Sequence, residues 1–227
     1  MQAAVEECVR SHRAWMTLNA NVGGGAVGRD GSIDWAWVPA ENTMNLLFPV
    51  APDADDIASV TRRADEFGAA ATALWSAVDR DLEGMADFGF ERGWSPWWMA
   101  AAPAEVPHAS GDRVAIVDTV RDHDDGRRAL AGRDDVVQAE ATVGGRYAGR
   151  AWLHLDDDVA GIYDMEVWPR FRRRGLGREL LGALVAEGAR RGARVATLNA
   201  TPEGEKLYAA CGFALVGEGR TWWRHRG

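Results

Sequence analysis

The stretch that decides the fold is Ile162-Tyr-Asp-Met-Glu-Val-Trp-Pro-Arg-Phe-Arg-Arg-Arg-Gly-Leu-Gly-Arg-Glu-Leu-Leu181. Residues 162–167 form a short apolar run typical of a strand, which Pro169 ends. Residues 172–177 are a basic turn that contains two glycines. From position 176 to about Arg191, apolar side chains recur at helical spacing. The stretch therefore predicts a strand, a turn and an amphipathic helix, in that order.

A turn of this composition at a helix N-terminus is suited to hold a phosphate group. Gly175 and Gly177 let backbone N–H groups approach an anion closely, and the helix dipole favours negative charge there. The neighbouring arginines add charge-assisted hydrogen bonds. A basic loop that only caps a helix explains the turn equally well when the turn is considered alone.

The overall composition is that of a globular chain, with 47% hydrophobic and 26% charged residues and enough length for a large core. A net charge of −8 argues against general nucleic-acid binding, so the basic cluster 170–174 stands out. No apolar run is long enough to span a membrane, and the N-terminus lacks a secretory pattern. We expect a cytoplasmic protein, monomeric or homodimeric, with no nucleic-acid or membrane partner.

No metal site is expected. Cys8 and Cys211 match no metal-ligand spacing and are interpreted as reduced thiols. The cluster Asp122-His123-Asp124-Asp125 could suggest a metal ion, but a solvated loop is favoured because no matching ligand set follows.

The first half of the chain alternates helical and β-prone patterns. The predicted elements are a helix over 1–20, a hairpin over 22–38 with its turn at Asp30-Gly31, a strand over 46–50, a helix over 54–67, a strand over 71–78, a short helix over 79–88 and a strand over 94–99. Residues 100–112 contain two prolines and few bulky side chains, which is typical of a linker.

The second half is richer in strands. Its predicted elements are strands over 114–120, 136–143, 147–155 and 162–167, a helix over 176–191, a strand over 194–198, a helix over 202–210 and strands over 213–216 and 221–224. This order predicts a mixed α/β sheet. Residues 89–98 and 212–223 also match locally, which suggests an internal duplication; coincidence of two Trp-rich strands is the alternative.

The motif Arg172-x-x-Gly175-x-Gly177, followed downstream by Leu207-Tyr208-x-x-Cys211-Gly212-Phe213, resembles the GNAT superfamily of N-acetyltransferases. The resemblance covers about 114–224, and the first half resembles a degenerate copy of the same fold. It implies an α/β (α+β) fold with a mixed, mostly antiparallel sheet flanked by helices, in a pseudo-tandem arrangement. We expect a degenerate domain over 1–103, a linker over 104–112 and an acetyltransferase domain over 113–227.

The resemblance also implies a donor and the residues that bind it. The donor is acetyl-CoA, and the acceptor is the amine of a small molecule or a peptide. The strand before the motif is expected to splay from its neighbour at a bulge, so that its backbone pairs with the pantetheine arm and the acetyl carbonyl. The implied cofactor-binding residues are Met165, Glu166, Val167, Arg172, Arg173, Arg174, Gly175, Leu176, Gly177, Arg178, Asn199 and Tyr208.

Two catalytic roles follow from the resemblance. Tyr208 stands where many members place the residue that protonates the leaving thiolate; a core tyrosine is the alternative. The general base is Glu166 or Asp164, acting directly or through water, although either could be an ordinary sheet residue. Period-two alternation places these two carboxylates on one face and Tyr163 and Met165 on the other. His154 is a lesser candidate, with a structural role favoured.

Two functions remain open from the sequence. The first is an enzyme that acetylates an amine bound between the two halves, where Trp15, Trp35, Trp37 or Trp152 could line the cleft, although most tryptophans are better explained as core. The second is a non-catalytic acyl-CoA-binding sensor or regulatory module. Because residues 51–56 are acidic where the first copy would need a basic turn, one cofactor per chain is expected.

Overall fold

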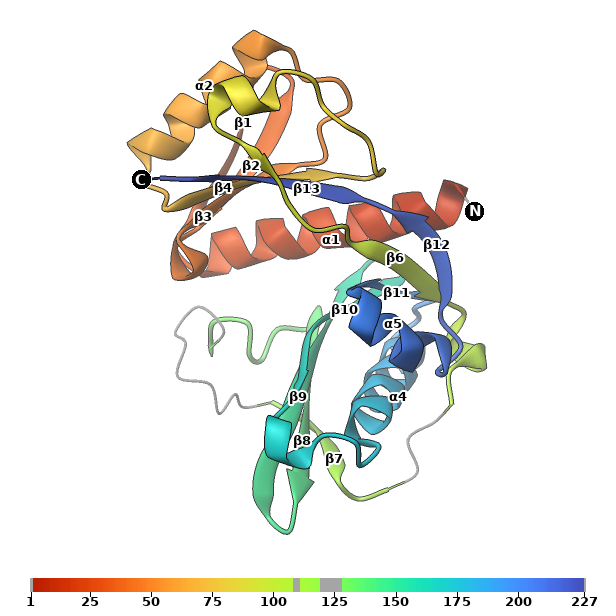
Figure 1. Ribbon diagram of the computed structural model, residues 1–227. Helices are drawn as coiled ribbons and strands as arrows, with labels where there is room; N and C mark the ends of the chain where they lie inside the picture. The colour runs from red at the N-terminus through yellow and green to blue at the C-terminus, as the bar shows by residue number, and fades with distance from the viewer. Residues whose placement is uncertain (1, 108–110, 119–127, 227) are drawn as a thin grey trace. The chain divides into compact units, whose positions relative to one another are not determined.

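The computed structural model describes residues 2–107, 111–118 and 128–226 (Figure 1). The acidic cluster Asp122–Asp125 lies outside the described residues. Of the helices in the described ranges, none combines the length and the apolar character that crossing a membrane would require.

The described residues divide into two compact units. The N-terminal unit comprises 13–96, 128–129 and 217–226, and the C-terminal unit comprises 2–12, 97–107, 111–118 and 130–216. The division falls within the first helix, α1 (Gln2–Val22), which confirms the helix expected over 1–20. Each unit contains one sheet, named sheet A in the N-terminal unit and sheet B in the C-terminal unit.

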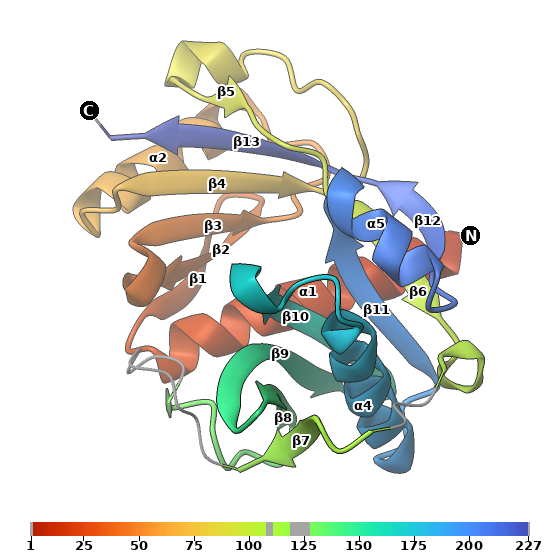
Figure 2. The ribbon, with the colours of Figure 1, turned by 60° about the horizontal axis from the view of Figure 1, so that its bottom comes forward.

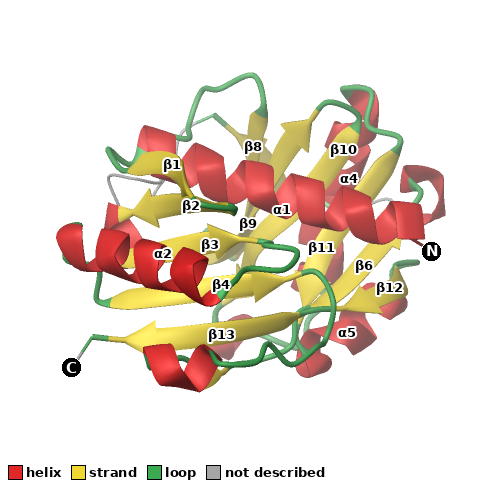
Figure 3. Ribbon diagram, turned by 90° about the horizontal axis from the view of Figure 1, so that it is seen from above, coloured by secondary structure: helices red, strands yellow, loops and turns green. Residues whose placement is uncertain are grey.

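Sheet A has the described strand order β1-β2-β3-β4-β13-β5. These strands are β1 (Ala26–Asp30), β2 (Ile33–Val38), β3 (Thr43–Leu47), β4 (Ala71–Ser76), β5 (Glu91–Arg92) and β13 (Arg220–His225). Strands β3 and β4 run parallel, and β13 runs antiparallel beside β4 (Figure 3). Helix α2 (Ala54–Glu66) connects the parallel pair and buries Ile57, Val60 and Ala64. The same core contains Trp35 of β2, so this tryptophan is a packing residue.

Local chemistry explains where these elements begin and end. The β1–β2 turn is Gly31-Ser32, one residue later than expected, with Gly31 at a φ of +58°. The helix expected over 79–88 is wrong: only a 3-10 turn, η2 (Met85–Phe88), forms there. Gly84 has a φ of +75°, a left-handed conformation that a continuous helix does not accommodate. A second 3-10 turn, η1 (Pro39–Glu41), joins β2 to β3.

Sheet B has the described strand order β12-β6-β11-β10-β9-β8-β7. Its strands are β6 (Trp97–Ala101), β7 (Val114–Val117), β8 (Val136–Val143), β9 (Arg146–Asp156), β10 (Val159–Val167), β11 (Val195–Ala200) and β12 (Ala214–Glu218). Two helices, α4 (Leu176–Arg190) and α5 (Pro202–Ala209), and two 3-10 turns, η3 (Pro103–Glu105) and η4 (Pro169–Phe171), complete the described elements.

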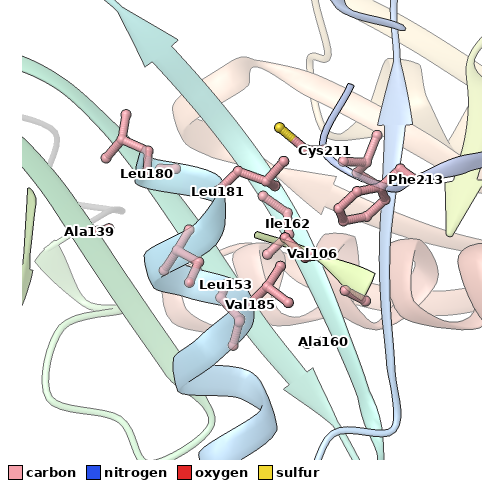
Figure 4. Packing of buried hydrophobic residues seen from close by; sticks show 14 of the residues in the cluster. Val106, Ala139, Leu153, Ala160, Ile162, Leu180, Leu181, Val185, Cys211 and Phe213 are labelled. Atoms are coloured by element: carbon pink, nitrogen blue, oxygen red, sulfur yellow. The ribbon is translucent and has the colours of Figure 1, made fainter. Parts of the chain in front are cut away.

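The core of the C-terminal unit lies between sheet B and α4, which contacts β7, β8, β9 and β10 (Figure 2). Leu180, Leu181 and Val185 of α4 belong to one buried cluster with Leu153 of β9 and Ile162 of β10 (Figure 4). Each fully buried side chain of this kind contributes about 1.5–3 kcal/mol. The apolar stripe predicted after the basic turn is therefore what fixes α4 to the sheet.

The first half of α1 packs on the other face of sheet B. Strand alternation directs Ile162 and Met99 toward α4, whereas Tyr163 and Trp98 face α1. The Ser11 and Tyr163 hydroxyl groups share a hydrogen bond of 2.7 Å, and both side chains are buried.

The last strand of each half of the chain pairs with a strand from the other half. The last strand of the first half is β6, which pairs with β11 in sheet B, and the last strand of the chain is β13, which pairs with β4 in sheet A. Hydrophobic pattern marks a strand without naming its partner, so the sequence could not reveal this exchange. The domain division at 104–112 stays a prediction; Val106 within that range is buried in the core of the C-terminal unit.

The two sheets share one arrangement. Each has a parallel pair joined by a helix (β3-α2-β4 and β10-α4-β11), an antiparallel strand beside the pair (β13 and β6) and a further strand beyond it (β5 and β12). This repetition supports the pseudo-tandem arrangement that the sequence suggested.

Candidate functional site

The parallel strands β10 and β11 separate partway along their length. In the described chain they pair only from Val159 to Gly161, which lie opposite Val195 to Thr197. Beyond this point β10 stays paired with β9, and β11 stays paired with β6. The edges that face each other after Gly161 and Thr197 therefore carry backbone N–H and C=O groups outside the ladder. The expected splay is present.

A bulge in β10 accompanies the splay. The β9–β10 register shifts between Tyr163 and Glu166, and Asp164 has a φ of +48°. The extra residue corrects the expected alternation: Tyr163 faces α1, whereas Met165 packs against the core on the α4 side. Asp164 and Glu166 are both exposed, and Glu166 lies directly opposite Arg150 of β9.

The basic turn follows β10 and leads into α4. Arg173 and Gly175 have φ angles of +62° and +84°, and Gly175 is the N-cap residue of the helix. The first hydrogen bond of the helix joins the Glu179 N–H to the Gly175 carbonyl at 3.1 Å. The N–H groups of residues 176–178 precede that bond, so the helix supplies them with no acceptor. The turn thus presents backbone donors at the positive end of the α4 dipole.

The arginines of the turn have different partners. The Arg172 Nε donates to the Val167 carbonyl at 2.9 Å, which folds this side chain back onto the end of β10. The guanidinium of Arg170 lies 4.8 Å from the centre of the buried Phe171 ring, and that of Arg174 lies 5.9 Å from it. Arg173 and Arg178 are exposed. The cluster keeps its positive charge at the surface around the start of α4.

Arg113, at the start of β7, joins the same turn. Its Nη2 donates to the Arg174 carbonyl at 3.1 Å, and its Nε donates to a Glu179 carboxylate oxygen at 3.1 Å. This residue was missed by sequence reasoning, because it lies 61 positions before Arg174 and belongs to no recognisable motif.

Helix α5 places Tyr208 beside the core of the C-terminal unit. Thr201 caps the helix, and its hydroxyl accepts from the Gly204 N–H at 3.2 Å. Burial raises the pKa of Tyr208 to about 12, so its hydroxyl is protonated at neutral pH. A Cβ atom at Gly177 of α4 would lie 3.0 Å from a methyl carbon of Leu207. The helix after the basic turn and the helix that carries Tyr208 are therefore in close contact.

The remaining candidates lie on the strands. Asn199 of β11 is half-buried, beyond the last β10–β11 pair. His154 of β9 is 6% exposed, and burial lowers its pKa; its Nε2 lies 3.9 Å from a carboxylate oxygen of Asp135. This environment agrees with the structural role favoured for His154.

The equivalent place in the N-terminal unit has neither separated parallel strands nor a basic turn. Strands β3 and β4 pair from Thr43 to Leu47 without separating. At the start of α2, the Asp53 carboxylate accepts from the Asp56 N–H at 2.8 Å, and the Asp56 carboxylate accepts from the Asp53 N–H. The N-terminus of α2 is therefore capped by two carboxylates of the chain, whereas the N-terminus of α4 has a glycine at the same position.

An open parallel pair beside a basic helix N-terminus is suited to hold a phosphate-bearing ligand between two strands. Residues 93–213 match the family model described as the acetyltransferase (GNAT) family. The match spans more than half of the chain, and the protein belongs to this family. Its family and fold support acyl transfer from acetyl-CoA.

Solved structures show the same fold at low sequence identity. A GCN5-related N-acetyltransferase from Kribbella flavida is 15% identical, with a TM-score of 0.63 and coverage of 96% of each chain. A GNAT-family acetyltransferase from Novosphingobium aromaticivorans is also 15% identical, with a TM-score of 0.61 over 94% of this chain and 96% of that chain.

A third structure is a tandem GNAT protein from the clavulanic acid biosynthesis pathway. It is 14% identical, with a TM-score of 0.55 over 98% of this chain and 96% of that chain. No functionally curated protein matches the sequence.

Proposed function

We propose that the protein transfers an acetyl group from acetyl-CoA to a primary amine, by direct attack of the amine in a ternary complex. One observation carries the proposal: the β10–β11 ladder stops at Gly161 and Thr197, on the strand that leads into the basic turn of α4. An open strand edge and an anion site on consecutive elements suit a ligand with an amide-bearing arm and a pyrophosphate.

The residues present fit that donor. The N–H groups at the start of α4, with Arg172, Arg173, Arg174 and Arg178 around them, would hold the pyrophosphate. The backbone edge at Met165, Glu166 and Val167, which is not paired with β11, would pair with the pantetheine arm, with Asn199 on the opposite strand. Among the described residues, a Cβ atom at Gly175 would meet Arg113 and Glu179 within 4 Å, at 3.7 and 3.8 Å. The described residues therefore leave room for a ligand beside this glycine.

Bound acetyl-CoA supplies an acetyl group activated as a thioester. The chain must then orient the thioester carbonyl, deprotonate the attacking amine and provide a proton to the departing sulfur. Tyr208 has the last role in this proposal, because its raised pKa of about 12 keeps the hydroxyl protonated and able to donate. Backbone N–H groups on the open edge of β10 would polarise the carbonyl.

Glu166 is our choice for the general base, acting directly or through water. It is exposed on β10 just after the bulge, where a soluble amine can reach it. Asp164 is the second candidate, since it is exposed at the bulge itself. The acceptor class is the amine of a small molecule or a peptide. A cytoplasmic location and a monomeric or homodimeric state stay predictions.

The test measures release of free thiol from acetyl-CoA across a panel of amines. The wild type should turn over at least one amine, and Tyr208→Phe should lower kcat by about a hundredfold with little change in acetyl-CoA affinity. Tyr147→Phe makes the same chemical change at a tyrosine of β9 and should leave kcat unchanged.

The assay also separates the second function. Tight binding of acetyl-CoA without turnover of any amine would favour the non-catalytic acyl-CoA-binding module. Failure to bind acetyl-CoA would contradict both functions.

A further inference from the structure

We propose that Arg113 is a positioning residue of the donor site, which cancels the charge of Glu179 beside the basic turn and holds the turn through the Arg174 carbonyl. The inference rests on the proposed function, because it concerns how strongly the turn binds a pyrophosphate. It assigns a role to a residue outside the motif that defines the site.

The guanidinium group of Arg113 forms hydrogen bonds with both the basic turn and the first turn of α4. The Arg113 Nη2 donates both to the Glu179 Oε1 and, at 3.1 Å, to the Arg174 carbonyl, while Nε donates to the Glu179 Oε2 at 3.1 Å. The contact is thus bidentate toward the carboxylate and adds a third acceptor from the backbone. The hydrogen bonds to Glu179 raise the pKa of Arg113.

The pair lies directly beside the glycine that caps α4. A Cβ atom built on Gly175 would be 3.7 Å from the Arg113 Nη2 and 3.8 Å from the Glu179 Oε1. A phosphate oxygen bound by the N–H groups of the turn would therefore come within a few ångströms of this carboxylate. Because like charges at such a distance repel strongly in a partly buried site, Glu179 on its own would oppose the ligand.

The fold holds Arg113 in place independently of the turn. Its backbone carbonyl accepts from the Thr142 N–H at 2.7 Å, at the end of the β7–β8 ladder. The Glu179 side chain is 15% exposed and that of Arg113 is 37% exposed, so the pair is shielded more than an ordinary surface ion pair. A cation fixed to the sheet can therefore compensate the carboxylate without moving when the ligand arrives.

A purely structural role makes different predictions. Glu179 lies in the first turn of α4, where a carboxylate stabilises the helix dipole, and Arg113 could merely accompany it. In that case, loss of Arg113 would lower stability slightly and leave ligand affinity unchanged. Charge compensation predicts instead that removal of Arg113 weakens ligand binding and that removal of the Glu179 charge restores it.

The experiment measures acetyl-CoA affinity by isothermal titration calorimetry for the full-length wild type, Arg113→Ala, Glu179→Gln and the double variant. Arg113→Ala should bind about tenfold more weakly, as expected for one uncompensated charge near a phosphate. The double variant should recover most of that loss. The loss should also shrink as salt rises, because screening weakens the repulsion. Thermal melting and circular dichroism verify that each variant is folded.

Arg133→Ala is the matched control. Arg133 makes a bidentate pair with Asp135 in the same unit, and its side chain is 40% exposed, close to the 37% of Arg113. This variant should bind acetyl-CoA like the wild type. Arg113→Lys keeps the charge but loses the fork, and should bind with intermediate affinity.

The outcomes are distinct. Wild-type affinity in Arg113→Ala overturns the inference, and so does a double variant as weak as Arg113→Ala. A wild type that does not bind acetyl-CoA overturns the proposed function, and this inference with it.

Discussion

Gly177 of α4 and Leu207 of α5 approach so closely that a methyl group on Gly177 would lie 3.0 Å from the Leu207 Cδ2. The contact links the N-terminal end of α4, where we propose that the pyrophosphate binds, to the helix that carries Tyr208. Gly177→Ala should displace α5 by a few tenths of an ångström. We expect a larger fall in kcat than in acetyl-CoA affinity, measured by the thiol-release assay and calorimetry.

The same contact supplies a compensating variant. Leu207→Ala removes the methyl groups that a side chain at position 177 would meet. The double variant Gly177→Ala/Leu207→Ala should therefore have a higher kcat than Gly177→Ala alone. Equal kcat in the two variants would show that crowding against α5 is not the cause.

A substitution at Gly175 tests whether the backbone conformation of the basic turn matters for binding. Its φ of +84° is unfavourable for a residue with a Cβ, yet the surrounding contacts leave room for one. Gly175→Ala should lower the free energy of unfolding by about 1–2 kcal/mol and weaken acetyl-CoA binding. Gly192→Ala is its control, because Gly192 has a φ of +100°, meets no described residue within 4 Å of an added Cβ and lies just after the far end of α4. It should lose similar stability and retain affinity.

The number of donor sites is the next prediction. In the N-terminal unit, β3 and β4 remain paired and the carboxylates of Asp53 and Asp56 occupy the start of α2. Calorimetry should therefore give one acetyl-CoA per chain. Asp53→Ala should leave that stoichiometry unchanged, whereas a second binding event in the wild type would contradict the prediction.

In the proposed mechanism, the dependence of kcat on alkaline pH follows from the pKa of Tyr208. Its pKa is raised from 10.0 to about 12, so the hydroxyl stays protonated well above neutral pH. The contribution of this burial to stability is present below pH 10 and is lost as pH rises toward 12. We expect kcat to be constant from pH 8 to about 10. A fall in kcat centred below pH 9, absent from Tyr208→Phe, would contradict the raised pKa.

His12 predicts acid sensitivity of stability. Burial lowers its pKa from 6.5 to about 3, because the charged imidazolium cannot be solvated in the core. The unfolded chain therefore binds a proton that the folded chain does not, between pH 6.5 and about 3. Stability should fall by about 1.4 kcal/mol per pH unit across that window for this residue.

Urea unfolding at pH 7 and pH 5 measures the effect. His12→Gln should lose less stability on acidification than the wild type. His154, whose pKa burial also lowers, remains in both proteins and adds a slope of the same sign. An identical pH dependence in wild type and His12→Gln would contradict the assignment.

The sequence predicted the local elements well. The strand, turn and helix of residues 162–181 were predicted correctly, because proline, glycine and an apolar stripe determine structure within a few residues of themselves. Asp53 and Asp56 likewise lie three positions apart, within reach of a local capping motif. The expected GNAT fold and splay are confirmed, while the roles of the individual site residues stay proposals.

Long-range features could not be predicted in the same way. The extra residue at Asp164 places Tyr163 and Met165 on opposite faces; the family resemblance implied a bulge in this strand, but period-two alternation could not locate it. Arg113 reaches its turn only because β7 is the edge strand of sheet B beside α4. Such contacts depend on strand order, which hydrophobic periodicity does not encode.

The exchanged strand β13 has a consequence for synthesis. It lies between β4 and β5 in sheet A, yet it follows all the described strands of sheet B along the chain and is therefore synthesised after them. Until then, β4 presents an open edge and β5 lacks its only described neighbour. The N-terminal unit, although made first, must therefore complete its sheet last, and the nascent chain holds an unsatisfied strand edge throughout translation of the acetyltransferase region.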